Sequence, residues 1–143
     1  MALFPKRGVD TSLPKSDRGF ASLDDFDFRL IPKNARVTLT LADSDSHQDE
    51  LRKIVESGEH ESAETAVSPR SMADERVDAP IPVRLFLGRR VSGVVGMIPR
   101  GFESLFDENV RRIDDRTGKT RIPVRIDHKK GAYRVVLLLG KTR

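Results

Sequence analysis

The sequence contains no cysteine and no tryptophan, only one tyrosine, and few aromatic residues overall, at 6%. Without cysteine, the chain can form neither disulfide bonds nor thiolate metal sites. No apolar run approaches the ~20 residues that cross a bilayer, and the N-terminus, MALFPKRGVD, lacks the apolar core of a signal peptide. We therefore expect a soluble, cytoplasmic protein that does not associate with membranes.

The composition indicates a compact part that carries solvated segments. The 143 residues suit one domain. The hydrophobic share of 37% is below the roughly 45–50% of a typical globular domain, and the charged share of 34% is above the usual quarter. Some of the chain therefore adds nothing to the core.

The charge is distributed unevenly along the chain. Residues 84–143 hold 15 Lys and Arg against 6 Asp and Glu, whereas residues 1–83 hold 11 against 16. Such a split is typical of a module that faces a polyanion, although a solvated basic surface has the same composition.

Two segments lack the periodic apolar pattern of a folded element. Residues 1–31 mix Pro, Gly, Ser and charges, which predicts a flexible tail, with residues 26–31 docking on the domain through Phe26 and Phe28. Residues 59–78 are rich in Ser, Ala and Glu, which predicts a mobile loop. The remainder, residues 32–143, is expected to form a single domain.

The first half of this domain contains one expected strand and one expected helix. RVTLTL, residues 36–41, alternates apolar and polar side chains, which predicts a half-buried strand. Ser46 and Asp49 resemble a capping box with a shorter acid, and Gly58 ends the helix that they begin.

The second half contains four expected strands and a second helix. Its apolar residues alternate in the strands and repeat at helical spacing in the helix. The expected strands are 82–87, 91–98, 121–127 and 132–139, and the expected helix is 102–113.

The resulting order, β-α-β-β-α-β-β, predicts an α+β fold. Short strands without crossover connections favour antiparallel pairing, so we expect a small, partly open β-barrel with two helices. Gly93 and Gly96 indicate a bulge or a sharp corner, and Pro123 indicates an edge strand.

Catalysis and metal binding have weak support in the sequence. Asp43 and Asp45 follow an apolar strand, where such a pair can hold Mg²⁺ for phosphotransfer, but the same residues can cap the next helix. The later strands lack the further carboxylates that this chemistry needs. His47, His60 and His128 are scattered, with no converging ligand set. We expect no enzyme activity, cofactor or metal.

The stronger pattern is basic, and it predicts contacts with phosphate. Guanidinium groups suit phosphate oxygens, and even spacing places Arg121 and Arg125 on one face of a hairpin, with Arg134 across from them. Alternation turns Tyr133, the one aromatic in the hairpin, away from Arg134. The expected partner is single-stranded DNA or RNA, contacted by Arg89, Arg90, Arg100, Arg121, Arg125, Lys129, Lys130 and Arg134.

Three stretches resemble the HIRAN family of domains. The family's opening strand and helix resemble RVTLTLADSDSHQDELRKIV, which begins at residue 36. Its strand that ends in Pro-Arg resembles VSGVVGMIPR, which begins at residue 91. Its closing strands resemble residues 121–139. The resemblance implies an OB-like barrel that recognises DNA, including single-stranded ends, with His47 and Arg100 on matching motifs. The family's Asn- and Asp-containing segment is replaced by GRRVS, and its binding aromatic by Met97.

Two alternatives to nucleic-acid binding stay open. A protein-interaction domain, with the N-terminal tail docking a partner, would present a flat apolar patch instead of a continuous basic groove. An Mg²⁺-dependent phosphotransfer enzyme would use Asp43 and Asp45.

Overall fold

The computed structural model describes residues 12–22, 36–65, 80–88, 90–104, 106–108, 110 and 122–141. In chain order, with η for a 3-10 helix, the elements are η1 (Lys15–Asp17), β1 (Leu39–Thr40), η3 (Asp45–His47), α1 (Gln48–Glu56), η4 (Glu59–Ser62), β2 (Glu64–Thr65), β3 (Pro82–Phe86), β4 (Val91–Met97), β5 (Val124–Lys129), β6 (Ala132–Leu137) and η5 (Leu139–Lys141). The described residues between 103 and 110 are also helical, within the expected helix 102–113.

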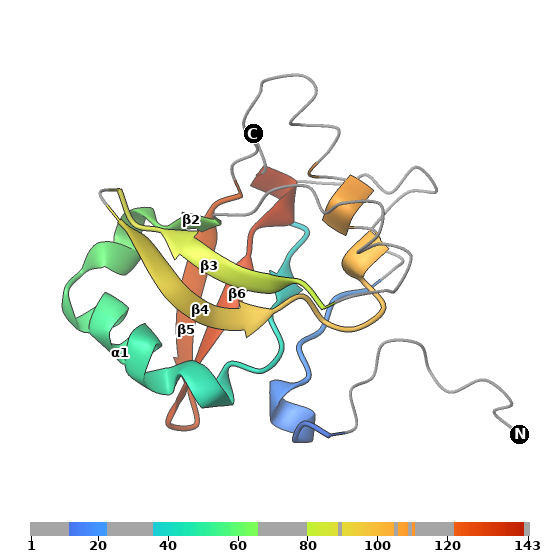
Figure 1. Ribbon diagram of the computed structural model, residues 1–143, viewed down its shortest axis with the longest axis horizontal. Helices are drawn as coiled ribbons and strands as arrows, with labels where there is room; N and C mark the ends of the chain where they lie inside the picture. The colour runs from blue at the N-terminus through green and yellow to red at the C-terminus, as the bar shows by residue number, and fades with distance from the viewer. Residues whose placement is uncertain are drawn as a thin grey trace, which may run out of the picture.

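The strands form two antiparallel sheets of three strands, ordered β1-β6-β5 and β2-β3-β4. In Figure 1 the strands β3 and β4 cross in front of β5 and β6, and α1 lies beside them. The helix α1 packs against β4 and β6, one strand from each sheet. The expected α+β class with antiparallel strands is confirmed. None of the described helices is long and apolar enough to cross a bilayer.

The core is built from the inward faces that alternation predicts. In β3 the side chains of Val83 and Leu85 are fully buried, whereas Pro82, Arg84 and Phe86 are exposed. In β6 the burial does not alternate, because Val135, Val136 and Leu137 are all buried. The largest fully buried apolar side chains are Leu39, Leu41, Leu51, Ile54, Val83, Leu85, Val95, Ile98, Val110, Ile122 and Leu137.

Two isolated bridges join the sheets, Glu64 to Pro123 and Ala42 to Met97. Around Pro123, the N–H of Thr65 donates to the Ile122 carbonyl at 3.0 Å, and the Val124 N–H donates to the Ala63 carbonyl at 3.1 Å. Proline has no N–H, so its neighbours supply the donors. The strand that follows, β5, is the edge of the β1-β6-β5 sheet, as expected, whereas Pro123 itself is bridged to β2.

The glycines of β4 mark the irregularity that the sequence indicates. Register shifts interrupt the β3–β4 pairing between Val83 and Phe86. A Cβ atom at Gly96 would lie 3.0 Å from the Ala42 carbonyl oxygen and 3.0 Å from the Leu41 Cβ. Glycine is required there because the backbone that follows β1 passes directly against β4.

Strand β1 is shorter than the expected strand over residues 36–41. Val37, Leu39 and Leu41 are buried as expected; Leu39 and Thr40 form the strand, and the Leu41 N–H also bonds to β6 by donating to the Val135 carbonyl at 2.9 Å. Beyond Leu137 the chain turns into η5, where the Gly140 N–H donates to the Val37 carbonyl at 3.0 Å.

The expected capping box is wrong. Ser46 instead donates its hydroxyl proton to Asp43 Oδ1 at 2.7 Å, and η3 precedes α1, which begins at Gln48. The expected helix end at Gly58 is confirmed: this residue has φ +78°, and its N–H donates to the Val55 carbonyl at 3.1 Å.

The segments expected to be loose contain ordered parts. Within 59–78, residues 59–65 form η4 and β2, and β2 pairs with β3. A two-residue strand is too short to show a period, so the sequence missed it. Residues 12–22 of the expected tail lie on the domain, where Phe20 bridges to Thr40. The predicted docking segment 26–31 and loop residues 66–78 lie outside the described residues.

Candidate nucleic-acid interface

The hairpin of β5 and β6 carries several of the predicted contact residues on one rigid element. Its register runs from Val124 opposite Leu137 to Lys129 opposite Ala132. Lys130 and Gly131 connect the strands, with φ +53° and +78°. Positive φ at both loop residues is the signature of a type I′ turn, whose twist matches that of the strands. The turn expected at this position is confirmed.

A stacked pair of rings lies beside this turn. His128 and Tyr133 face each other across the hairpin, with ring centroids 4.4 Å apart and planes inclined by 17°. Tyr133 packs partly against the core, whereas His128 is exposed. The backbone of Tyr133 is fixed by Gln48, which accepts from its N–H at 2.8 Å and donates to its carbonyl at 3.0 Å. Adjacent positions of β6 turn Tyr133 away from Arg134, as expected.

Lys129 and Lys130 are the predicted contact residues most open to a ligand. Both are exposed. Within the described part of the chain, no Asp or Glu forms an ion pair with either lysine. Their charges are therefore not neutralised by any described neighbour.

The predicted arginines outside the hairpin have acidic partners where they are described. Arg90 donates from Nε and Nη2 to the two oxygens of Glu59, at 3.0 and 2.9 Å. These bonds hold the pKa of Glu59 at about 2, well below its usual value. Arg100 Nη1 lies 3.1 Å from Glu103 Oε2. Arg89 and Arg121 lie outside the described residues.

Arg125 and Arg134 share the outer face of the hairpin, as expected, but differ in environment. Asp127 lies opposite Arg134 in the register and two residues from Arg125. Arg125 is exposed and donates to both oxygens of Asp127, at 2.8 and 3.1 Å. Exposed pairs of this kind contribute little to stability, and a phosphate can compete for the arginine.

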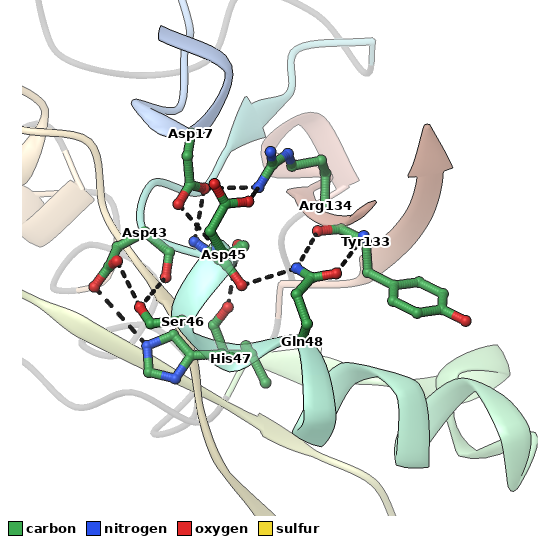
Figure 2. A network of polar contacts seen from close by, with 10 residues as sticks. Asp17, Asp43, Asp45, Ser46, His47, Gln48, Tyr133 and Arg134 are labelled. Atoms are coloured by element: carbon green, nitrogen blue, oxygen red, sulfur yellow. Dashed lines mark hydrogen bonds and ion pairs between the residues drawn. The ribbon is translucent and has the colours of Figure 1, made fainter. Parts of the chain in front are cut away.

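Arg134, expected among the residues that contact nucleic acid and therefore to face solvent, is largely buried, so that orientation is wrong. Its side chain is 14% exposed, and its Nη1 donates to Asp17 Oδ1 at 2.8 Å and to Asp45 Oδ1 at 2.7 Å. Figure 2 shows the guanidinium directed at both carboxylates. Asp17 also accepts from the backbone N–H groups of Ser44, at 2.8 Å, and Asp45, at 2.9 Å. Burial raises the pKa of Asp17, although the hydrogen bonds and the Arg134 charge oppose this effect.

Asp43 and His47, proposed for phosphotransfer and for the family match, lie at the edge of this network, whereas Asp45 belongs to it. Asp43 has φ +57°, accepts from the Ser46 hydroxyl and lies 3.9 Å from His47 Nε2. His47 occupies the N-cap position of α1 without a side-chain capping bond. Among the described residues, no three His, Asp or Glu side chains converge as metal ligands.

The sequence did not point to Asp17 or Gln48 as parts of this site. Asp17 lies 117 residues from Arg134 along the chain, in a segment without periodicity, so no local signal links them. Gln48 is an ordinary helix residue until its contact with Tyr133 is known. The stacked rings could have been found, because a two-residue turn at Lys130 and Gly131 places His128 opposite Tyr133.

Comparison of the chain with protein-family models, with curated proteins and with solved structures finds no match.

Proposed function

We propose that the protein is a non-enzymatic module that binds single-stranded DNA or RNA through the β5–β6 hairpin. One observation carries this proposal: Lys129 and Lys130 are exposed at the hairpin turn and directly follow His128, whose ring stacks on Tyr133. Single-strand binders combine cations that follow the phosphates with rings on which bases stack.

Each part of the hairpin has a distinct task in this proposal. The two lysines attract the backbone and release its counterions. The exposed ring of His128, backed by Tyr133, receives a base. Arg125 lies on the same strand and exchanges Asp127 for a phosphate oxygen. Arg90 and Arg100 would have to give up Glu59 and Glu103 in the same way, so they are secondary contacts.

We also propose that the two sheets form the partly open barrel of an OB-like, HIRAN-type domain. Pairing runs β1-β6-β5 in one sheet and β2-β3-β4 in the other. The Glu64–Pro123 bridge extends the backbone pairing from the start of β5 to β2. The Ala42–Met97 bridge extends the pairing from β4 to the residues after β1. This nearly cyclic series supports the barrel, a fold that uses its strands and loops to bind oligonucleotides.

The decisive experiment is a salt series of fluorescence anisotropy titrations with a labelled single-stranded oligonucleotide. The test variant is Lys129→Gln/Lys130→Asn, because asparagine suits the positive φ of the turn. The matched control is Arg52→Gln/Lys53→Gln, which removes two charges from exposed positions of α1. We expect the log–log salt slope to fall by about 1.4 in the test variant, since each single-strand phosphate contact contributes about 0.7. The control should keep the wild-type slope.

Two outcomes contradict the proposal. One is no binding of either DNA or RNA by the wild-type protein at low salt. The other is an equal loss of affinity in the test and control variants, which would show that net charge, and not the hairpin, governs binding.

A protein-interaction domain is the second candidate, supported by an exposed apolar pair. Phe86 and Val91 lie opposite each other at the β3–β4 turn, 38% and 51% exposed, and Phe20 is 71% exposed. Apolar side chains grouped on one hairpin indicate a contact surface when a partner covers them. If Phe86→Ser/Val91→Thr removes self-association or partner binding while oligonucleotides never bind, this alternative replaces the first.

A further inference from the structure

A buried carboxylate from the N-terminal segment fills a site lined by hydrogen-bond donors. Asp17 is 1% exposed. Its Oδ1 accepts from the Ser44 N–H and from Arg134 Nη1, both at 2.8 Å, and its Oδ2 accepts from the Asp45 N–H at 2.9 Å. Two successive backbone donors and a guanidinium form a binding site for an oxyanion, here occupied by a residue of the same chain.

The donors are held in place by contacts that do not involve Asp17. The hydroxyl of Ser44, fully buried, donates to the Val95 carbonyl at 3.1 Å. Gln48 Nε2 donates to the carbonyls of Ser44, at 2.8 Å, and Tyr133, at 3.0 Å, which ties the loop to the strand that carries Arg134. The site therefore keeps its shape when Asp17 withdraws.

The segment that carries Asp17, residues 12–22, is hereafter called the strap. Asp17 is its one buried residue, and the Phe20 side chain is 71% exposed. Beyond the carboxylate, the contacts of the strap include the paired backbones of Phe20 and Thr40, at 2.9 and 3.1 Å, the Asp43 N–H donating to the Asp17 carbonyl at 2.9 Å, and Ala21, which is partly buried against the core. Segments with so little apolar burial open at low free energy.

We propose that the strap is a detachable inhibitor, and that its Asp17 carboxylate holds the place of a nucleic-acid phosphodiester between Arg134 and the N–H groups of Ser44 and Asp45. This inference rests on the proposed function and adds its regulation. Strap and nucleic acid compete for one site, so release of the strap raises affinity.

Charge and position favour a phosphodiester as the competing ligand. Asp45 Oδ1 already lies 2.7 Å from Arg134, and Asp43 is nearby in the same loop, so a singly charged group is repelled less than a dianionic terminal phosphate. Lys129 shares the outer face of the hairpin with Arg134, because Lys129 pairs with Ala132 and Asp127 pairs with Arg134. A nucleic-acid strand bound by Lys129 therefore extends along the same face toward the guanidinium of Arg134. The raised pKa of Asp17 agrees with a carboxylate whose burial is costly.

Two substitutions in the full chain release the strap in different ways. In Asp17→Asn the side-chain NH2 group takes the place of the oxygen that accepts from the Asp45 N–H. Two donors then face each other, so this hydrogen bond is lost. In Gly19→Ala the carboxylate stays, but the new Cβ would lie 2.4 Å from the Thr40 carbonyl oxygen at a residue with φ +67°. Amide exchange at Phe20 and Thr40, whose N–H groups bond each other's carbonyls, reports strap release without reference to any ligand.

We expect faster exchange at both amides in each variant, and oligonucleotide affinity raised about three- to tenfold, the effect of losing roughly one net hydrogen bond from the docked state. Asp17→Asn/Arg134→Gln should lose that gain. Once the strap has detached in the Asp17→Asn background, Asp45 is the described acidic partner that Arg134 keeps, and its side chain is 42% exposed and tolerates the loss.

The remaining outcomes separate this inference from the proposed function. Faster exchange with unchanged oligonucleotide affinity overturns the inference, while lysine-dependent binding in the wild type would preserve the proposed function. Unchanged amide exchange at Phe20 and Thr40 in both variants also overturns the inference. If the variants gain affinity only for a peptide that carries a carboxylate, the site binds a protein ligand, and the assignment to a phosphodiester is wrong. Failure of wild-type and variants alike to bind any oligonucleotide removes both proposals.

Discussion

Tyr133 lies directly opposite His128 in the β5–β6 hairpin, with their ring centroids 4.4 Å apart. The chain has no tryptophan and no second tyrosine, so its tyrosine emission comes from Tyr133 alone. If a base stacks on the exposed face of His128, the emission of Tyr133 should change on binding. Because the imidazole lies between the base and Tyr133, His128→Ala should alter the emission of the free protein.

The same substitution should weaken oligonucleotide binding by about 1–3 kcal/mol, the usual contribution of one stacked base. Titration of the unlabelled protein with an unlabelled oligonucleotide, followed by tyrosine emission, measures both effects. Lys53→Gln, on α1, is the control and should leave the emission unchanged. Binding without any change in tyrosine emission would place the ligand away from the hairpin.

Lys130 adopts φ +53°, a conformation that suits asparagine and glycine better than lysine. We expect Lys130→Asn to raise the free energy of unfolding by about 0.5–1 kcal/mol, because the strain of a left-handed residue is reduced. The control Lys129→Asn removes the same charge within β5, where asparagine has low strand propensity, and should not stabilise. Urea unfolding of the two variants makes the comparison. Equal stabilisation by both would attribute the effect to charge.

The parts of the fold that could be predicted are those set by neighbouring residues. Alternation places Val83 and Leu85 inward correctly, and Pro123 marks the edge strand, because each depends on local geometry. Strand β2 was missed because Glu64 and Thr65 are ordered by partners on both sides and not by their own pattern. The burial of Arg134 was missed because it is caused by Asp17, 117 residues away. Periodicity indicates which face a residue occupies, but not which distant segment covers that face.

Arg134 and Arg125 should respond differently to substitution, although they share one face of the hairpin. Arg134→Gln leaves Asp17 without its cation, and because the strap can detach and expose the carboxylate to water, the expected loss is about 1–2 kcal/mol, below the full cost of breaking a buried pair. Arg125→Gln breaks an exposed pair with Asp127, so the expected loss is under about 1 kcal/mol. Urea unfolding at neutral pH measures both. Equal losses would show that Arg134 is not held by Asp17 in solution.

The Glu59–Arg90 pair should be visible in the pH dependence of stability. Hydrogen bonds from Arg90 and from the Ser57 hydroxyl lower the pKa of Glu59 from 4.5 to about 2. Because the pKa in the folded protein is depressed, the folded state favours the ionised form. The stabilisation is therefore complete above pH 4.5 and disappears as the pH falls toward 2.

Glu59→Gln lacks this titration, so its thermal midpoint should fall less than that of the wild-type protein between pH 4.5 and about 2. The pair is exposed, so the difference should be small and should shrink as salt is added. Arg90→Gln removes the same interaction from the other side and should reproduce the flatter profile. Parallel profiles for the wild type and both variants would show that Glu59 titrates normally and that the pair does not persist in solution.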